Sequence, residues 1–123
     1  MNPAKKISRL IIAGSREYPV GFDIDHAFAV SSFDLDSLRV VLSGTARGID
    51  RLGEQFAGRH RIQLERHPAN WDKYGKSAGY RRNEQMAQQA FGLLACWDGQ
   101  SRGTRHMIDL AITNHLAVFV YRM

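Results

Sequence analysis

The sequence has a single cysteine and no long apolar run. Cys96 cannot form a disulfide within the chain, and because it lies in the apolar stretch Leu93–Trp97 we interpret it as a buried packing residue. No apolar stretch approaches the roughly 20 residues that cross a bilayer, and Met1–Leu10 has no apolar signal-peptide core. We therefore expect a cytoplasmic protein that makes no contact with a membrane.

Composition and charge predict one globular domain with an anionic partner. The chain has 123 residues, of which 44% are hydrophobic and 24% charged, and this balance excludes a disordered chain or a fibrous repeat. No linker, internal repeat or low-complexity tract divides it, so we expect a single domain over residues 1–123. Lys and Arg outnumber Asp and Glu by 17 to 12, which favours a nucleotide or a polynucleotide as partner.

Short apolar runs alternate with segments of helical periodicity. The runs predict five strands, at Ile7–Ala13, Leu38–Ser43, Ile62–Glu65, Leu93–Trp97 and Leu116–Tyr121. Apolar residues recurring every three to four positions predict four helices, over Phe22–Ser32, Ile49–Ala57 with Gly58 as the stop, Tyr80–Ala90 and Thr104–Asn114. The run at Ile62 alternates apolar and polar residues, which is typical of an edge strand.

This alternation predicts an α/β fold with a known place for ligands. We expect a Rossmann-like, doubly wound, parallel five-stranded sheet in the order 3-2-1-4-5, with helices on both faces. In such folds ligands bind beyond the carboxyl ends of the strands, where the strand order reverses. The loops that follow the strands should therefore carry the functional residues.

The loops after the first two predicted strands combine glycine with arginine and hydroxyl side chains. Gly14–Arg16 offers a flexible backbone, a hydroxyl and a planar cation. In Ser43–Asp50, Gly44 and Gly48 lie four residues apart at a strand-to-helix junction, where free amides bind anions. The spacing matches neither GxGxxG nor a Walker A loop. We predict that Arg16 and the amides of this glycine loop, Gly44–Gly48, hold a phosphate.

The loops after the third and fourth predicted strands add aromatic and basic residues. We expect His67–Gly79 to be a structureless loop in which Trp71 either stacks on a base or anchors the loop. Two arginines open the helix that follows, where cations oppose the helix dipole unless an anion lies nearby. The loop Trp97–Thr104 again has two glycines before a helix, and in the predicted strand order it faces Gly14–Arg16 across the crevice.

Together these segments define the predicted ligand site. Its residues are Gly14, Ser15, Arg16, Ser43, Gly44, Thr45, Ala46, Arg47, Gly48, Asp50, Trp71, Arg82, Asn83, Asp98, Gly99, Ser101, Gly103 and Thr104. We predict no metal and no cofactor, only a nucleotide-type ligand.

Four motifs in this order resemble a known family over nearly the whole chain. They are Gly14-Ser15-Arg16, Ser43-Gly44-Thr45-Ala46-Arg47-Gly48-Ile49-Asp50, the set Ala69-Asn70-Trp71 with Gly75-Lys76-Ser77-Ala78-Gly79 and Arg82-Asn83-Glu84-Gln85-Met86, and Trp97-Asp98-Gly99-Gln100-Ser101-Arg102-Gly103-Thr104. They resemble the YspA/cpYpsA-related branch of the SLOG superfamily. The resemblance implies a Rossmann-like domain that binds a nucleotide or nucleotide derivative as a sensor or binding module, often in a phage or defence setting.

Two members of the same superfamily imply alternative functions. Lonely Guy phosphoribohydrolases cleave an N-glycosidic bond with an acidic residue just after a Gly-Thr loop. The matching residues here are Arg105 and His106, which leaves Glu84 and Asp98 as candidate catalytic carboxylates for a nucleoside monophosphate hydrolase. DNA-processing protein A has a similar Ser-Gly-x-Ala-x-Gly-Ile-Asp stretch and binds single-stranded DNA, although it carries additional parts for which this chain has no room.

We also expect a homodimer. SLOG-like domains commonly pair, and a chain this small exposes much of its surface when alone. The predicted helix Thr104–Asn114 has apolar residues over a broader face than one sheet contact needs, namely Met107, Ile108, Leu110, Ala111 and Ile112. A partner copy packed there would lie beside Arg105 and His106.

Overall fold

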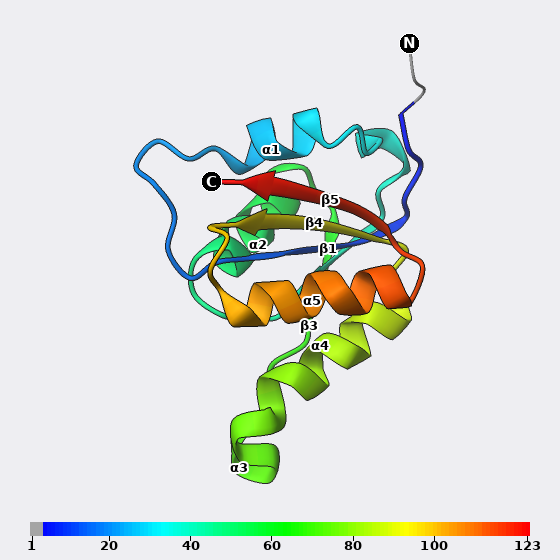
Figure 1. Ribbon diagram of the computed structural model, residues 1–123. Helices are drawn as coiled ribbons and strands as arrows, with labels where there is room; N and C mark the ends of the chain where they lie inside the picture. The colour runs from blue at the N-terminus through cyan, green and yellow to red at the C-terminus, as the bar shows by residue number, and fades with distance from the viewer. Residues whose placement is uncertain (1–3) are drawn as a thin grey trace.

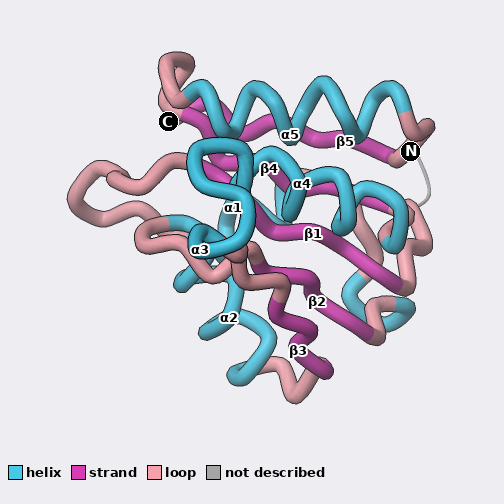
Figure 2. Tube along the Cα trace, turned by 90° about the horizontal axis from the view of Figure 1, so that it is seen from below, coloured by secondary structure: helices cyan, strands magenta, loops and turns pink. Residues whose placement is uncertain are grey.

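The computed structural model describes residues 4–123 as one sheet covered by helices on both faces (Figure 1). The five strands are β1 (Arg9–Gly14), β2 (Val40–Ser43), β3 (Gln63–Arg66), β4 (Gly92–Trp97) and β5 (Ala117–Arg122). All neighbouring strands pair in parallel, in the order β3-β2-β1-β4-β5, which Figure 2 shows across the sheet. The predicted fold and strand order are confirmed, and the alternating β3 is an edge strand as predicted.

Four helices of seven residues or more cover the two faces of the sheet. They are α1 (Ile24–Val30), α2 (Ile49–Arg59), α4 (Ala78–Gln89) and α5 (Arg102–Thr113). Side chains of α1 and α2 pack with Leu10 and Ile12, while α4 and α5 pack with Ile11 and Ala13. Because successive residues of β1 point to opposite faces, both sets must be apolar. This is why β1 is a continuous apolar run rather than an alternating one.

The connection between β3 and α4 differs from the prediction. His67–Gly79 is not structureless, because it contains the four-residue helix α3 (Trp71–Tyr74) and a 3₁₀ turn (Gly75–Ser77). The Asn70 side chain caps α3 by accepting a hydrogen bond from the Lys73 N–H at 3.1 Å. In Figure 1, α3 lies beyond the sheet, at the far end of α4.

All four predicted helices differ from the structure by one or two residues at one or both ends. α1 is two residues shorter at each end than predicted, and α5 begins two residues earlier, at Arg102. α2 runs through Gly58 to Arg59 instead of stopping at the glycine. α4 begins at Ala78, two residues before the predicted start. Arg82 consequently lies in the second turn of α4 rather than at its first residues, and its side chain reaches the Gly44 carbonyl.

The apolar residues of α5 are mostly used within the chain. Met107, Ile108 and Ala111 are buried against the sheet and α4, whereas Ile112 is 59% exposed. The free apolar face predicted for this helix is therefore narrower than expected, and the homodimer stays a prediction. Within residues 4–123, no helix has the length and apolar character that a bilayer crossing requires.

Candidate functional site

The loops after β1 and β4 meet where the strand order reverses. The Ser15 N–H donates to the Cys96 carbonyl at 3.1 Å, and the Asp98 N–H donates to Ser15 Oγ at 3.0 Å. A Cβ on Gly14 would lie 2.1 Å from the Cys96 carbonyl oxygen, so only glycine permits this approach. The predicted juxtaposition of the two loops is confirmed.

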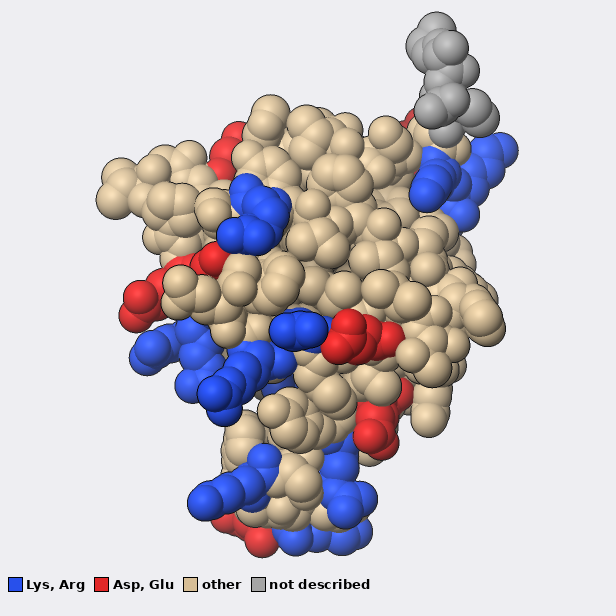
Figure 3. Space-filling view, in the orientation of Figure 1, with Lys and Arg blue, Asp and Glu red and all other residues tan. Residues whose placement is uncertain are grey.

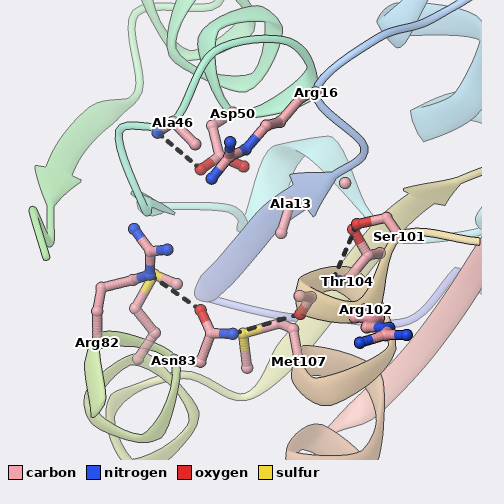
Figure 4. A pocket seen from close by; sticks show the side chains of 13 residues that line it. Ala13, Arg16, Ala46, Asp50, Arg82, Asn83, Ser101, Arg102, Thr104 and Met107 are labelled. Carbon is pink, nitrogen blue, oxygen red and sulfur yellow. Dashed lines mark hydrogen bonds between the residues drawn. The ribbon is translucent and has the colours of Figure 1, made fainter. Parts of the chain in front are cut away.

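A cleft of about 290 Å³ opens beside this junction (Figure 4). Its lining comes from β1 and its loop, the glycine loop, α4 and the start of α5: Ala13, Gly14, Arg16, Ala46, Asp50, Arg82, Asn83, Met86, Ser101, Arg102, Gly103, Thr104 and Met107. We call it the phosphate cleft, for the role proposed below.

A second cleft of about 470 Å³ adjoins the phosphate cleft. It is lined by Arg16, Gly44, Thr45, Ala46, Arg47, Pro68, Ala69, Trp71 and Arg82. We call it the aromatic cleft, because Trp71 is 54% exposed there and offers an indole to a ligand. Arg16, Ala46 and Arg82 line both clefts and thus form the wall between them.

Arg82 is held in that wall by its neighbours. Its Nη1 donates to the Gly44 carbonyl, and its Nε donates to Asn83 Oδ1 at 2.9 Å. Burial lowers the pKa of Arg82, the Asp50 carboxyl opposes this, and the positive charge of Arg16 adds to the lowering. Among the described residues, neither Arg16 nor Arg82 forms an ion pair within 4.0 Å. An anion between the two arginines would relieve their repulsion.

Asp50 is a buried carboxyl on the wall of the phosphate cleft. It is 5% exposed, and its Oδ2 accepts a hydrogen bond from the Ala46 N–H at 3.0 Å. Burial raises the pKa of Asp50 to about 6, although the hydrogen bond from Ala46 and the charge of Arg82 act in the opposite direction. Asp50 is one of the predicted site residues and lines this cleft, whereas its burial is evident only in the structure.

Two backbone amides of the glycine loop donate hydrogen bonds to side chains of the same segment. The Thr45 N–H donates to Ser43 Oγ at 3.1 Å, and the Ala46 N–H donates to Asp50. Two of the amides predicted to bind phosphate thus already donate within the chain, and the prediction for the amides of Gly44, Arg47 and Gly48 stays a prediction. The N–H of Ile49, at the start of α2, donates to the Ser15 carbonyl at 3.1 Å, so this end of α2 is also partly satisfied by the chain.

The N-terminus of α5 presents its first residues to the phosphate cleft. Ser101 caps the helix by accepting from the Thr104 N–H at 3.3 Å. Arg102 and Gly103 follow the cap, and the first amides of a helix have no carbonyl acceptor within it. Both residues line the phosphate cleft, where these amides and the positive end of the helix dipole favour an anion.

The comparison with known proteins found a relative in a bacteriophage. The chain is 32% identical over 104 residues to the Gene 61 protein of Mycobacterium phage D29, covering 80% of this chain and 83% of that protein. The chain belongs to the Gene 61 protein family. No family model matches the chain, and no solved structure matches it. This relative is a phage protein, which fits the phage half of the phage or defence setting that the resemblance implies.

Several predicted site residues serve the loops of this Gene 61 family member rather than its clefts. Ser15 and Ser43 are buried and hydrogen-bonded inside their loops. Gly48 has φ +82°, and a Cβ there would lie 2.4 Å from the Arg16 carbonyl oxygen. Asp98 accepts from the N–H groups of Gln100 and Ser101 at 2.8 Å each, which fixes the loop before α5.

Gly99 and the two candidate catalytic carboxylates also lie outside both clefts. Gly99 has φ +84° and packs against the Arg122 guanidinium. Glu84 is exposed on α4 and Asp98 is exposed in its loop, so neither candidate catalytic carboxylate lines a cleft. The buried carboxyl of the site is Asp50.

Sequence reasoning missed some of the lining. Met86 and Met107 are each 1% exposed and form part of the phosphate cleft. Each follows a predicted site residue, Asn83 or Thr104, by three positions, which is about one helical turn. Helical spacing could therefore have predicted that both methionines line the same cleft. Ala13, Arg102, Pro68 and Ala69 complete the missed set.

Basic side chains also gather around α3. Figure 3 shows Lys and Arg concentrated over the lower part of this face, where Figure 1 places α3. The Arg81 guanidinium lies 4.4 Å and the Lys73 ammonium 5.1 Å from the ring centroid of Tyr74. This basic surface adjoins the aromatic cleft and raises the concentration of anions near it.

Proposed function

We propose that the chain binds a nucleotide as a sensor or binding module, with the phosphate in the phosphate cleft. The observation that carries this proposal is the pair Arg16 and Arg82, which line both clefts and have no ion-pair partner among residues 4–123. On the opposite side of the phosphate cleft, the first amides of α5 add hydrogen-bond donors for an anion. Guanidinium groups and helix N-termini are the groups that bind phosphate best in proteins.

The base is proposed to occupy the aromatic cleft. Trp71 and Pro68 supply flat apolar surfaces there, and an indole stacks on any nucleobase. Because Arg16 and Arg82 separate the clefts, a phosphate held by them can carry a nucleoside on the Trp71 side. The support is thus a chemical match between two adjoining clefts and the two parts of a nucleoside monophosphate.

Adenosine monophosphate (AMP) is the probe that tests this proposal. Isothermal titration calorimetry should give a measurable Kd, and Arg16→Ala should weaken it by about 10- to 150-fold, the equivalent of 1.5–3 kcal/mol for a charge-assisted hydrogen bond. Arg16 is exposed, so the melting temperature without ligand should stay within about 2 °C of the native value.

A matched control is Arg61→Ala, which removes the same charge from a groove lined by Leu38, His60 and Ile62, away from both clefts. It should leave the AMP affinity unchanged. Equal losses in the two variants would reveal a general charge effect and contradict the proposal. Affinity that instead grows with oligonucleotide length and falls steeply with salt would favour single-stranded nucleic acid as the ligand.

One observation favours hydrolysis as a second candidate function. Asp50 is a carboxyl of raised pKa that lines the phosphate cleft, and catalytic acids are commonly tuned by burial in this way. If AMP is hydrolysed, water adds to C1′ of the ribose as the bond to the base breaks, giving free adenine and ribose 5-phosphate. Chromatography should then detect adenine with the native chain and none with Asp50→Asn. AMP that binds and stays intact supports a sensor.

A further inference from the structure

Asn83 links the anion-binding wall to a histidine on the next helix. The side chain is 6% exposed, between α4 and α5. Its Oδ1 accepts from Arg82 Nε at 2.9 Å, and its Nδ2 lies 3.4 Å from the Gly103 carbonyl oxygen and 3.2 Å from His106 Nδ1. One buried amide therefore contacts an arginine, a helix carbonyl and an imidazole.

These partners permit one orientation of the amide. Arg82 Nε is a donor only, so it must face the amide oxygen, and the Gly103 carbonyl is an acceptor only, so it must face the amide nitrogen. His106 Nδ1 then also faces a donor. It can only accept, which places the proton of the neutral ring on Nε2.

The surroundings of His106 favour this neutral ring. The Tyr80 ring on α4 lies against it, with centroids 4.2 Å apart. Burial lowers the pKa of His106, while the charges of Glu84 on α4 and Asp109 on α5 oppose the lowering. At neutral pH the ring is thus mainly uncharged, and Nδ1 keeps its lone pair for Asn83.

Protonation of His106 at Nδ1 removes the acceptor of the hydrogen bond from Asn83. An Nδ1–H would face the amide N–H of Asn83, so that two donors oppose each other. Turning the amide by half a rotation does not solve this, because its nitrogen would then face Arg82 Nε–H and its oxygen would face the Gly103 carbonyl. Either the imidazole leaves the Tyr80 ring or Arg82 loses its Nε partner.

We propose that His106 is a positioning residue: acting through Asn83, its uncharged ring holds the Arg82 guanidinium in the wall between the two clefts. Its effect on ligand affinity rests on the proposed function, whereas the link from His106 to Arg82 is a property of the chain alone. Acidification weakens the hydrogen bond between Arg82 Nε and Asn83, while the hydrogen bond from Arg82 Nη1 to the Gly44 carbonyl remains.

The first test uses ligand-free protein. Nitrogen-15 NMR reports the His106 tautomer and the Arg82 Nε–H resonance across a pH titration. The proposal expects the Nε2–H tautomer at neutral pH, and it expects the Arg82 resonance to move with the same midpoint as the His106 ring. An Nδ1–H tautomer, or an Arg82 signal that ignores the His106 midpoint, overturns it.

Two substitutions separate positioning from structure. His106→Asn keeps an acceptor near the Nδ1 position and cannot become protonated. The Arg82 Nε–H resonance should therefore stay at its neutral-pH position and no longer change with pH at the His106 midpoint. His106→Leu removes the acceptor and should shift the Arg82 resonance at every pH. The same changes at His26, which is exposed on α1, are controls and should leave Arg82 unaffected. An Arg82 signal that is the same in His106→Asn and His106→Leu contradicts the role.

AMP titrations then separate this proposal from the proposed function. His106→Leu should weaken AMP binding about 2- to 10-fold, the loss expected for one hydrogen bond, and His106→Asn should restore most of it. Coupled NMR signals without AMP binding support the positioning role and overturn the proposed function. AMP binding that depends on Arg16 with uncoupled NMR signals overturns the positioning role alone.

Discussion

Replacing the buried carboxyl of Asp50 by an amide should remove the destabilisation of the folded state that the ionised carboxylate causes at neutral pH. Burial raises the pKa of Asp50 from 3.8 to about 6. Each unit of pKa corresponds to about 1.4 kcal/mol, so the ionised group makes the folded state less stable by about 3 kcal/mol than the protonated group does. The asparagine side chain of Asp50→Asn carries no charge, and its amide oxygen can still accept from the Ala46 N–H.

The sign of the pH dependence follows from the raised pKa. As the pH falls through about 6, folded Asp50 takes up a proton that the unfolded chain binds only near pH 4. The free energy of unfolding of the native chain, measured relative to Asp50→Asn, should therefore rise on acidification by up to about 3 kcal/mol. Above about pH 7 the difference should be constant.

Urea unfolding at a series of pH values measures this difference. The comparison with Asp50→Asn cancels the contributions of carboxylates remote from Asp50, whereas Glu54, whose charge acts on Asp50, stays in the difference. Asp36→Asn is a matched control, because Asp36 is exposed in the turn Leu35–Ser37 and its substitution measures the effect of losing one exposed negative charge. A flat difference curve for Asp50→Asn would refute the reasoning that burial dominates the pKa of Asp50.

Three further predictions follow from single positions and from assembly. Thr45 is β-branched and has φ +66°, so Thr45→Gly should raise the free energy of unfolding by about 0.5–1 kcal/mol by releasing backbone strain, as urea unfolding will show. Trp71→Ala should weaken AMP binding by about 1–3 kcal/mol in calorimetry, the range for base stacking, while the exposed indole contributes little to the melting temperature; the opposite pattern would make Trp71 a structural anchor. Light scattering should give twice the chain mass of 13.9 kDa, and a monomer mass would exclude the dimer.

The strands and their order could be predicted from the sequence because burial on both faces leaves a strong signal. β1 and β4 are apolar at nearly every position, and only a strand covered twice needs this. Once the order 3-2-1-4-5 is predicted, the meeting of Gly14–Arg16 with the loop after β4 follows from topology. Helix α3 left no comparable signal, because its four residues make only about one helical turn, which is too short for a repeating pattern.

The site could be predicted by segment but not by side chain. Gly44 and Gly48 mark a loop, yet only the structure shows that Ser43 and Asp50 occupy two of its amides. Arg82 forms part of the wall between the two clefts because its side chain extends from α4 and donates to the Gly44 carbonyl. No local sequence pattern indicates this long-range contact. The burial that tunes Asp50 is likewise a property of the packed fold.

The central claim is that one phosphate lies between Arg16, Arg82 and the start of α5, and a backbone NMR titration tests it directly. Inorganic phosphate should shift the N–H signals of Arg102 and Gly103, and AMP should shift these and the Trp71 indole signal as well. Adenosine without phosphate should leave the α5 signals in place. Shifts confined to the α3 surface, or no shifts on addition of AMP, would contradict the account.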